Sequence, residues 1–174
     1  MKIFRLQNTS GAYIEVSNYG AALVSVVVPD KNGNLDNIIL SYNKIDDYLN
    51  DKYYLGSTVG RVANRISKAQ FELDGVVYRL DNSNHGGKRG FSKQFFETKE
   101  ESNRIIFTFL SKDGEGGFPG NLKLTVTYSF SEDNELTIEY EAISDKRTVF
   151  NPTNHAYFNL TGGEVDILGH KLKV

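Results

Sequence analysis

The sequence of 174 residues contains no cysteine and no tryptophan, and it has only three histidines, three prolines and one methionine. The lack of cysteine excludes a disulfide scaffold, a cysteine-ligated zinc site and thiol catalysis. An excess of one charge is also missing, since 20 Lys and Arg residues stand against 22 Asp and Glu residues. This balance gives no electrostatic reason to expect a nucleic-acid or anionic-membrane partner, and we expect neither.

Long hydrophobic runs are absent as well. The longest, residues 21–28, is interrupted by Ser25 and is far too short to span a bilayer. Residues 1–10 lack the apolar core of a secretory signal peptide. We therefore expect a cytoplasmic protein whose length suits one compact domain or part of a larger one.

Short apolar stretches rich in Val, Ile, Phe, Tyr and Thr recur along the chain, and these residue types favour strands. Asn32-Gly33 and Asp74-Gly75 are typical hairpin turns. Residues 122–130 and 136–140 alternate apolar with polar side chains, which indicates an antiparallel hairpin with one wet face. The expected strands are 2–6, 13–16, 23–28, 37–40, 70–73, 76–80, 95–100, 104–110, 121–130, 136–143 and 155–160, with a helical turn only at 45–49.

This pattern predicts an all-β protein, an antiparallel β-sandwich or a related double-sheet architecture, with residues 1–174 forming a single domain. The last residues, 171–174, alternate polar with apolar side chains like the opening of a strand. An open, half-buried edge strand promotes aggregation, and complete domains usually protect it. We therefore expect the sandwich to be incomplete at its C-terminus and the chain to be the first part of a longer protein.

The three histidines are the first candidates for chemistry, because imidazole exchanges protons near neutral pH. His85 lies in a loop beside Gly86 and Gly87. It either bonds the backbone of its own loop or contacts a ligand that the glycines allow to approach. His170, which follows a glycine near the end of the chain, is interpreted as structural.

His155 belongs to an aromatic and polar segment. If residues 154–160 form a strand, His155, Tyr157 and Asn159 share one face. An imidazole, a phenol and a carboxamide together offer donors, acceptors and an aromatic surface that suit a sugar. The alternative is that this face is the outer, wet face of a sheet.

Arg61 and Arg65 lie four residues apart among small side chains. Arg65 is able to donate several hydrogen bonds of fixed geometry to hydroxyls or a carboxylate. The alternative is a pair of solvated or ion-paired charges. His85 and His155 are distant in sequence and have no local carboxylate motif beside them, so we expect neither a metal nor another cofactor.

Four segments together resemble the galactose mutarotase (aldose 1-epimerase) family. They are GRVANRI at 60–66 followed by FELDG at 71–75, NHGGKRGF at 84–91, DGEGGFPG at 113–120 and NHAYFNL at 154–160. Four motifs in the family's order are far more specific than any one of them. The similarity runs along the whole chain but covers only about the first half of a typical member.

The resemblance implies a large antiparallel β-sandwich, the mutarotase-like supersandwich, with a sugar cleft on its concave face. By motif match, His155 would be the general acid. Asn64, Arg65 and His85 would contact sugar oxygens, and Tyr157 would line the site. The family also uses a substrate-binding Asp and a general-base Glu, both in its second half, and nothing in this sequence matches them.

The implied activity is that of an aldose 1-epimerase, which interconverts the α and β anomers of hexoses such as galactose and glucose by acid–base ring opening. Two alternatives stay open. One is a non-catalytic carbohydrate-binding half-domain. The other is a hexose-6-phosphate epimerase, for which Lys88 and Arg89 are the only local candidates to bind phosphate. The preferred sugar and the oligomeric state are left open.

Overall fold

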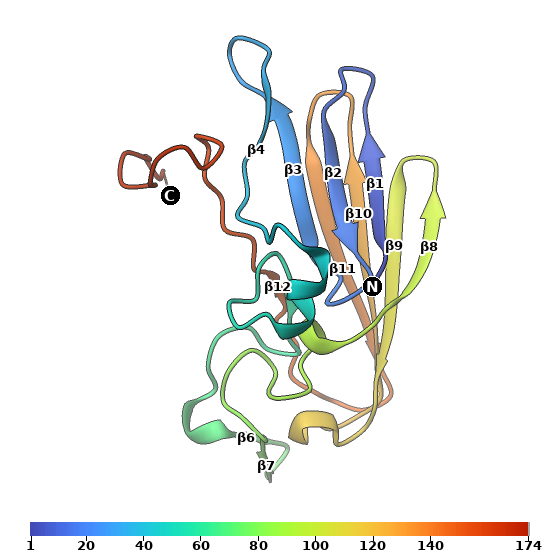
Figure 1. Cartoon of the computed structure of the whole chain (residues 1–174). Coiled ribbons are helices and arrows are strands. Elements are labelled where there is room, and N and C mark those ends of the chain that lie inside the picture. Colours follow the sequence, from blue (N-terminus) through green and yellow to red (C-terminus); the bar gives the residue numbers. More distant parts are fainter. Residues whose placement is uncertain (174) are drawn as a thin grey trace.

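The computed structural model describes residues 1–173 and consists mainly of antiparallel strands (Figure 1). The strands are β1 (Ile3–Gln7), β2 (Tyr13–Ser17), β3 (Leu23–Pro29), β4 (Leu35–Asn37), β5 (Thr58–Val59), β6 (Gln70–Leu73), β7 (Val76–Arg79), β8 (Glu97–Glu101), β9 (Arg104–Ser111), β10 (Leu122–Phe130), β11 (Leu136–Ser144) and β12 (Thr153–Asn154). Short 3-10 turns are η1 (Ile45–Asn50), η2 (Ser67–Ala69), η3 (Phe91–Lys93) and η4 (Glu115–Gly117). The all-β prediction is confirmed. Within residues 1–173, no helix has the length and apolar character needed to cross a membrane.

Two four-stranded sheets form the body of the molecule, with strand orders β1-β2-β3-β4 and β11-β10-β9-β8 (Figure 1). Every second side chain of β10 is buried, as the alternation predicted. The inner faces of both sheets contribute to one apolar core, whose members include Leu6, Ile14, Val16, Leu23, Val26, Ile105, Phe107, Leu124, Val126 and Tyr128. This core holds the sandwich rigid beneath the loops that carry the predicted site.

Local turn chemistry explains the hairpins. Asp74 and Gly75 both adopt positive φ, 53° and 77°, which is the geometry of the two-residue turn between β6 and β7. Between β3 and β4, one carboxylate oxygen of Asp30 accepts the N–H groups of Asn32 (2.8 Å) and Asn34 (2.9 Å). The two-residue turn at Asp74-Gly75 is therefore confirmed. The turn predicted at Asn32-Gly33 does join two strands, but it lies in a longer loop over residues 30–34, because Pro29 pairs with Leu35.

The strand predicted at 37–40 is shifted toward the N-terminus, because β4 ends at Asn37. The side-chain oxygen of Asn37 accepts the Val26 N–H (3.0 Å), where a continuing ladder would use a backbone carbonyl. The amide side chain thus ends regular pairing between these strands.

The prediction of a strand at 155–160 is wrong, because β12 ends at Asn154. The chain changes partners at this point: the His155 N–H bonds Ser57 O (2.9 Å), and the Tyr157 carbonyl accepts the Leu40 N–H (2.8 Å). Two different neighbours in succession prevent one continuous ladder. At the end of the described part, residues 171–173 have no regular secondary structure, and Val174 lies outside the described residues.

Arg61 is a buried cross-link, with only 2% of its surface exposed. Its guanidinium donates to the carbonyls of Pro119 (2.8 Å) and Gly120 (2.8 Å). It also donates to the hydroxyls of Ser111 (3.0 Å) and Thr148 (3.1 Å). The interpretation of Arg61 as a solvated or ion-paired charge is therefore wrong, because neutral oxygens from distant loops surround it.

Candidate active site

Backbone pairing brings three distant segments of the chain to one place. β12 pairs with β5, with Thr153 opposite Val59 and Asn154 opposite Thr58. An isolated bridge joins Arg65 to Asn84, which attaches the histidine loop to the arginine segment. His85, His155 and the residues just before and after β5 therefore become neighbours. The strand β12, which ends just before His155, is labelled near the centre of Figure 1.

His85 is held by a reciprocal pair of bonds to one residue. Its N–H donates to the Asn64 carbonyl (2.9 Å), and its ring Nδ1 accepts the Asn64 N–H (3.0 Å). Because a backbone N–H only donates, Nδ1 must be unprotonated, and the neutral ring carries its proton on Nε2. The loop thus fixes the ring and leaves an Nε2–H donor free to face a ligand.

Gly86 explains why this loop approaches the arginine segment so closely. Its φ is 84°, and a Cβ placed on it would lie 1.6 Å from the carbonyl oxygen of Gly60. Only glycine fits both the left-handed backbone and the close contact. Gly86 therefore allows the two loops to pack closely, and this packing fixes the position of His85.

Four rings form one cluster at this site, with His155 in contact with the other three. The imidazoles of His85 and His155 lie 5.1 Å apart, centroid to centroid, and are nearly perpendicular at 88°. The Tyr157 ring is 5.1 Å from His155. The Tyr54 ring lies 4.6 Å from His85 and 5.7 Å from His155. The Tyr157 hydroxyl donates to the Tyr53 carbonyl (3.0 Å), so this phenol presents its ring rather than its O–H.

The structure brings the predicted site residues together to different degrees. His85, His155 and Tyr157 meet through their rings, and Asn64 reaches His85 through its backbone. Arg65 is exposed, and within residues 1–173 its guanidinium has no hydrogen-bond or ion-pair partner. The charge of Arg65 acts on His85, so its free guanidinium is available near this imidazole to bind oxygen atoms.

Asn159 does not join this group, contrary to the expectation of a shared face. Its amide nitrogen donates to the Val165 carbonyl (2.7 Å), and its oxygen accepts the Thr161 hydroxyl (2.7 Å). The carboxamide therefore stabilises a local turn. His170 also makes a local contact, with its Nε2 accepting the Leu160 N–H (3.0 Å).

Tyr54 is the neighbour of both histidines that the sequence reasoning missed. It stands just before the turn into β5, and its backbone has a positive φ of 60°. A tyrosine carries no sequence signal for a left-handed backbone, since glycine and asparagine are the usual residues there. Only the tertiary pairing of β5 with β12 reveals its place.

The pKa of His85 lies below its ordinary value of 6.5, first because of burial and then because of the charges of His155 and Arg65. The unfolded chain therefore takes up this proton at a higher pH than the folded chain does. We expect the free energy of unfolding to fall as the pH is lowered from about 7 through 6.5 and toward the folded pKa. Urea denaturation at a series of pH values measures this dependence.

His85→Asn is the matched control for the pH experiment. Asparagine tolerates the positive φ, and its side-chain oxygen is able to accept the Asn64 N–H in place of Nδ1. In the variant, the free energy of unfolding should depend less on pH, because the contribution of His85 is gone. An unchanged pH dependence would show that other groups cause it.

The residue before His155, Asn154, is held by hydrogen bonds to buried polar groups. The Asn154 amide donates to the Gly56 carbonyl (2.7 Å) and to the Tyr128 hydroxyl (3.1 Å). The Tyr128 hydroxyl in turn donates to the Ala21 carbonyl (2.7 Å), and burial raises its pKa well above the ordinary value. This chain of bonds runs from the core to the residue that precedes His155.

Tyr128→Phe removes the middle of that chain of bonds. The Ala21 carbonyl and the Asn154 amide each lose a buried partner, and we expect a loss of roughly 1–3 kcal/mol of unfolding free energy. Urea denaturation measures it. A variant as stable as the parent chain would show that these groups find other partners.

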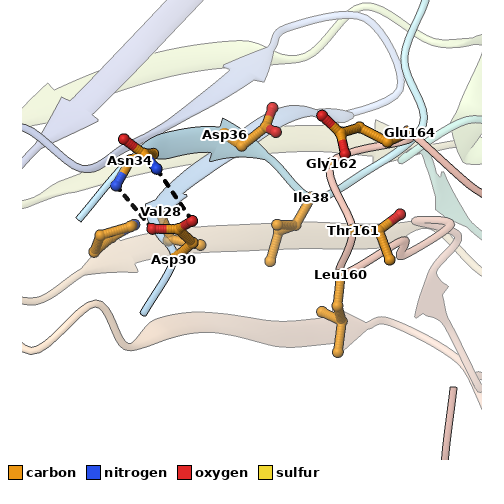
Figure 2. A pocket seen from close by; sticks show the side chains of 10 residues that line it. Val28, Asp30, Asn34, Asp36, Ile38, Leu160, Thr161, Gly162 and Glu164 are labelled. Carbon is orange, nitrogen blue, oxygen red and sulfur yellow. Dashed lines mark hydrogen bonds between the residues drawn. The ribbon is translucent and has the colours of Figure 1, made fainter. Parts of the chain in front are cut away.

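A pocket of 530 Å³ lies elsewhere, between the β3–β4 hairpin and the C-terminal segment (Figure 2). Its polar lining includes Asp30, Asp36 and Glu164, and none of the predicted site residues borders it. Hydrogen bonds from Asn34, and to a smaller extent from Asn32, lower the pKa of Asp30 and hold its carboxylate in the turn. Within residues 1–173, no group of three or more His, Cys, Asp or Glu side chains is placed to hold a metal.

Comparison with solved structures defines the class of protein. An aldose epimerase homologue from C. elegans superposes with a TM-score of 0.87 at 32% identity, over 91% of this chain and 51% of that one. Galactose 1-epimerase from Lactobacillus acidophilus gives a TM-score of 0.78 at 39% identity, over 90% of this chain and 48% of that one. The sandwich is thus that of the aldose epimerases.

The chain belongs to the aldose 1-epimerase family, whose model matches residues 2–174. It is 39% identical over 167 residues to galactose mutarotase of Rattus norvegicus, and this alignment covers 92% of this chain and 48% of that protein. It is 35% identical over 179 residues to aldose 1-epimerase of Escherichia coli, and this alignment covers 99% of this chain and 52% of that protein. The chain therefore spans about half the length of the curated relatives that it matches.

Proposed function

We propose that this chain supplies the proton-donating half of an aldose 1-epimerase site, in which His155 is the general acid. The observation that carries the proposal is the contact between the perpendicular imidazoles of His85 and His155, with the free guanidinium of Arg65 nearby. One ring with a fixed tautomer and a second ring beside it suit one hydrogen-bond donor and one proton donor. Family membership supports this assignment.

The proposed reaction opens and recloses the sugar ring. A base removes the proton of the C1 hydroxyl, the bond between C1 and the ring oxygen breaks, and His155 gives its proton to that oxygen. After rotation about the C1–C2 bond, the steps run in reverse on the other face of the aldehyde. Charge that develops on the ring oxygen is stabilised by Arg65.

Each remaining predicted residue has a role in holding the sugar. The Nε2–H of His85 and the side chain of Asn64 bind hydroxyl oxygens. Tyr157, whose hydroxyl is engaged with Tyr53, offers its ring to the apolar face of the sugar. The general base and the substrate-binding aspartate are expected in the second half of the family's sequence.

The proposed substrates are free aldoses such as galactose and glucose. The relatives from rat and from L. acidophilus are named for galactose, and this favours a free sugar over a sugar phosphate. No cofactor takes part in the proposed reaction. A single domain over residues 1–174 and a cytoplasmic location remain predictions, which limited proteolysis and cell fractionation would test.

Calorimetry and polarimetry together test the proposal. We expect galactose or glucose to bind the chain, and we expect a fusion protein that appends the rest of the E. coli enzyme to accelerate the decay of optical rotation of the pure α-anomer. Binding without acceleration by the fusion would favour the carbohydrate-binding half-domain. Preference for galactose 6-phosphate would favour the sugar-phosphate epimerase. Absence of both binding and acceleration would overturn the proposal.

A further inference from the structure

Tyr54 contacts both members of the histidine pair. Its ring meets His85 at a 62° interplanar angle and His155 at 36°, with centroid distances of 4.6 and 5.7 Å. Among the rings of residues 1–173, Tyr54 alone contacts both imidazoles. Tyr54 therefore occupies the third corner of a triangle whose other two corners are the histidines.

The Asp51 carboxylate fixes the start of the segment that carries Tyr54 by hydrogen bonds. One oxygen of this carboxylate accepts the N–H of Tyr53 and the other accepts that of Leu55, both at 2.8 Å. Asp51 also accepts the hydroxyl of Tyr42 (2.8 Å). At the end of the segment, the Tyr54 carbonyl accepts the Ser57 N–H (3.0 Å). The backbone on both sides of Tyr54 is thereby fixed, and its ring has a defined position.

The backbone of Tyr54 is in an unfavourable region. Its φ of 60° is left-handed, where a bulky side chain costs free energy that glycine or asparagine avoids. Strain of this kind persists only where the surroundings impose it, and it gathers at functional sites. If this position only closed the turn, glycine would do so at a lower free-energy cost. We therefore infer that the tyrosine ring itself contributes to the site.

We propose that Tyr54 is a positioning residue, which fixes the mutual orientation of the His85 and His155 imidazoles by packing against both. The edge contact with His85 and the tilted contact with His155 hold the His155 ring at the angle from which it faces the ligand. Within residues 1–173 the Tyr54 hydroxyl forms no hydrogen bond, so the ring carries the effect. The value of this orientation for catalysis rests on the proposed function, but the orientation itself does not.

NMR of the labelled imidazoles in the 174-residue chain tests this directly. Tyr54→Gly removes the ring and suits the backbone, and Tyr54→Asn does the same with some side chain retained. We expect both variants to shift the imidazole signals of His85 and His155 and to weaken the cross-relaxation between the two rings. Tyr54→Phe should restore the parent spectrum.

Tyr53→Ala is the matched control, because Tyr53 is the adjacent tyrosine, is 64% exposed and contacts neither imidazole through its ring. It should leave the imidazole signals in place. If sugar binds the parent chain, Tyr54→Gly should weaken that binding by about threefold to tenfold, whereas Tyr54→Phe should not.

Two results would overturn the inference. One is an unchanged pair of imidazoles in Tyr54→Gly and Tyr54→Asn. The other is unfolding of both variants while Tyr54→Phe stays folded, which would make Tyr54 a folding element. A parent chain that binds no sugar would count against the proposed function alone, since the NMR comparison needs no ligand.

Discussion

Arg61→Leu is expected to destabilise the fold by about 3–5 kcal/mol, because several buried oxygen acceptors lose their donor at once. The leucine side chain would leave the carbonyls of Pro119 and Gly120 and the hydroxyl of Ser111 without their donor. Each buried acceptor that loses its partner costs about 1–3 kcal/mol. Urea denaturation of the variant should show a much lower midpoint, or no cooperative transition at all.

Arg61 is a buried cation that has no ion-pair partner within residues 1–173. Burial lowers its pKa, and the charges of Glu115, Asp113 and Asp145 act in the opposite direction. No carboxylate within residues 1–173 forms an ion pair with it, so carbonyl and hydroxyl oxygens accept its hydrogen bonds, and the Phe118 ring lies 5.7 Å from its Cζ. Arg61→Lys should rescue little, because an ammonium group cannot reproduce the planar fork that reaches several oxygens at once.

Arg65→Leu is the control that the chain itself offers. This arginine is four residues away but exposed, and its guanidinium has no partner within residues 1–173. We expect its stability to stay within about 0.5 kcal/mol of the parent chain, while sugar binding weakens. Equal destabilisation of the two leucine variants would show that the cross-link of Arg61 contributes nothing special.

The two arginines also show where sequence reasoning stops. Their residue type and local surroundings are alike, so the pattern indicated one pair of charges. What separates them is the segment from the end of β9 at Ser111 to Pro119 and Gly120, about fifty to sixty residues further along, which supplies oxygens to Arg61. Burial of one guanidinium is therefore a property of tertiary packing, and the local sequence carries no trace of it.

Features that depend on neighbours in sequence were predictable. The turns at 74–75 and 30–34 follow from residues that tolerate or stabilise them within a few positions, and the alternation in β10 follows from its one wet face. The segment 155–160 failed because alternation says nothing about a change of partner. Its residues pair first with the β5 segment and then with residues 38–40, and both lie far away in sequence.

The candidate site divides in the same way. Motifs identified His85, His155 and Arg65 as residues to consider, and the structure brings their segments together. The tautomer of His85 was beyond prediction, since it depends on the N–H of Asn64. The place of Tyr54 was also beyond prediction, since it depends on a left-handed backbone that tyrosine does not signal.

His155→Asn is expected to have the largest effect on activity. In the fusion protein that completes the family fold, turnover of the α-anomer should fall by about 10²–10⁴-fold, because the carboxamide cannot donate a proton to the ring oxygen. The fold should survive, since the bonds of His155 to Ser57 and Gly56 use its backbone and asparagine retains them. Polarimetry measures the rate, and urea denaturation checks the stability.

His170→Asn is the control for that experiment, because this imidazole serves a backbone N–H outside the ring cluster. It should leave turnover within about twofold, since surface changes usually cost under 0.5 kcal/mol. If His155→Asn kept near-full activity, the general acid would have to be another group, and His85 would be the first to examine. Its Nδ1 must then remain an acceptor for Asn64, so only Nε2 could carry the proton to the sugar.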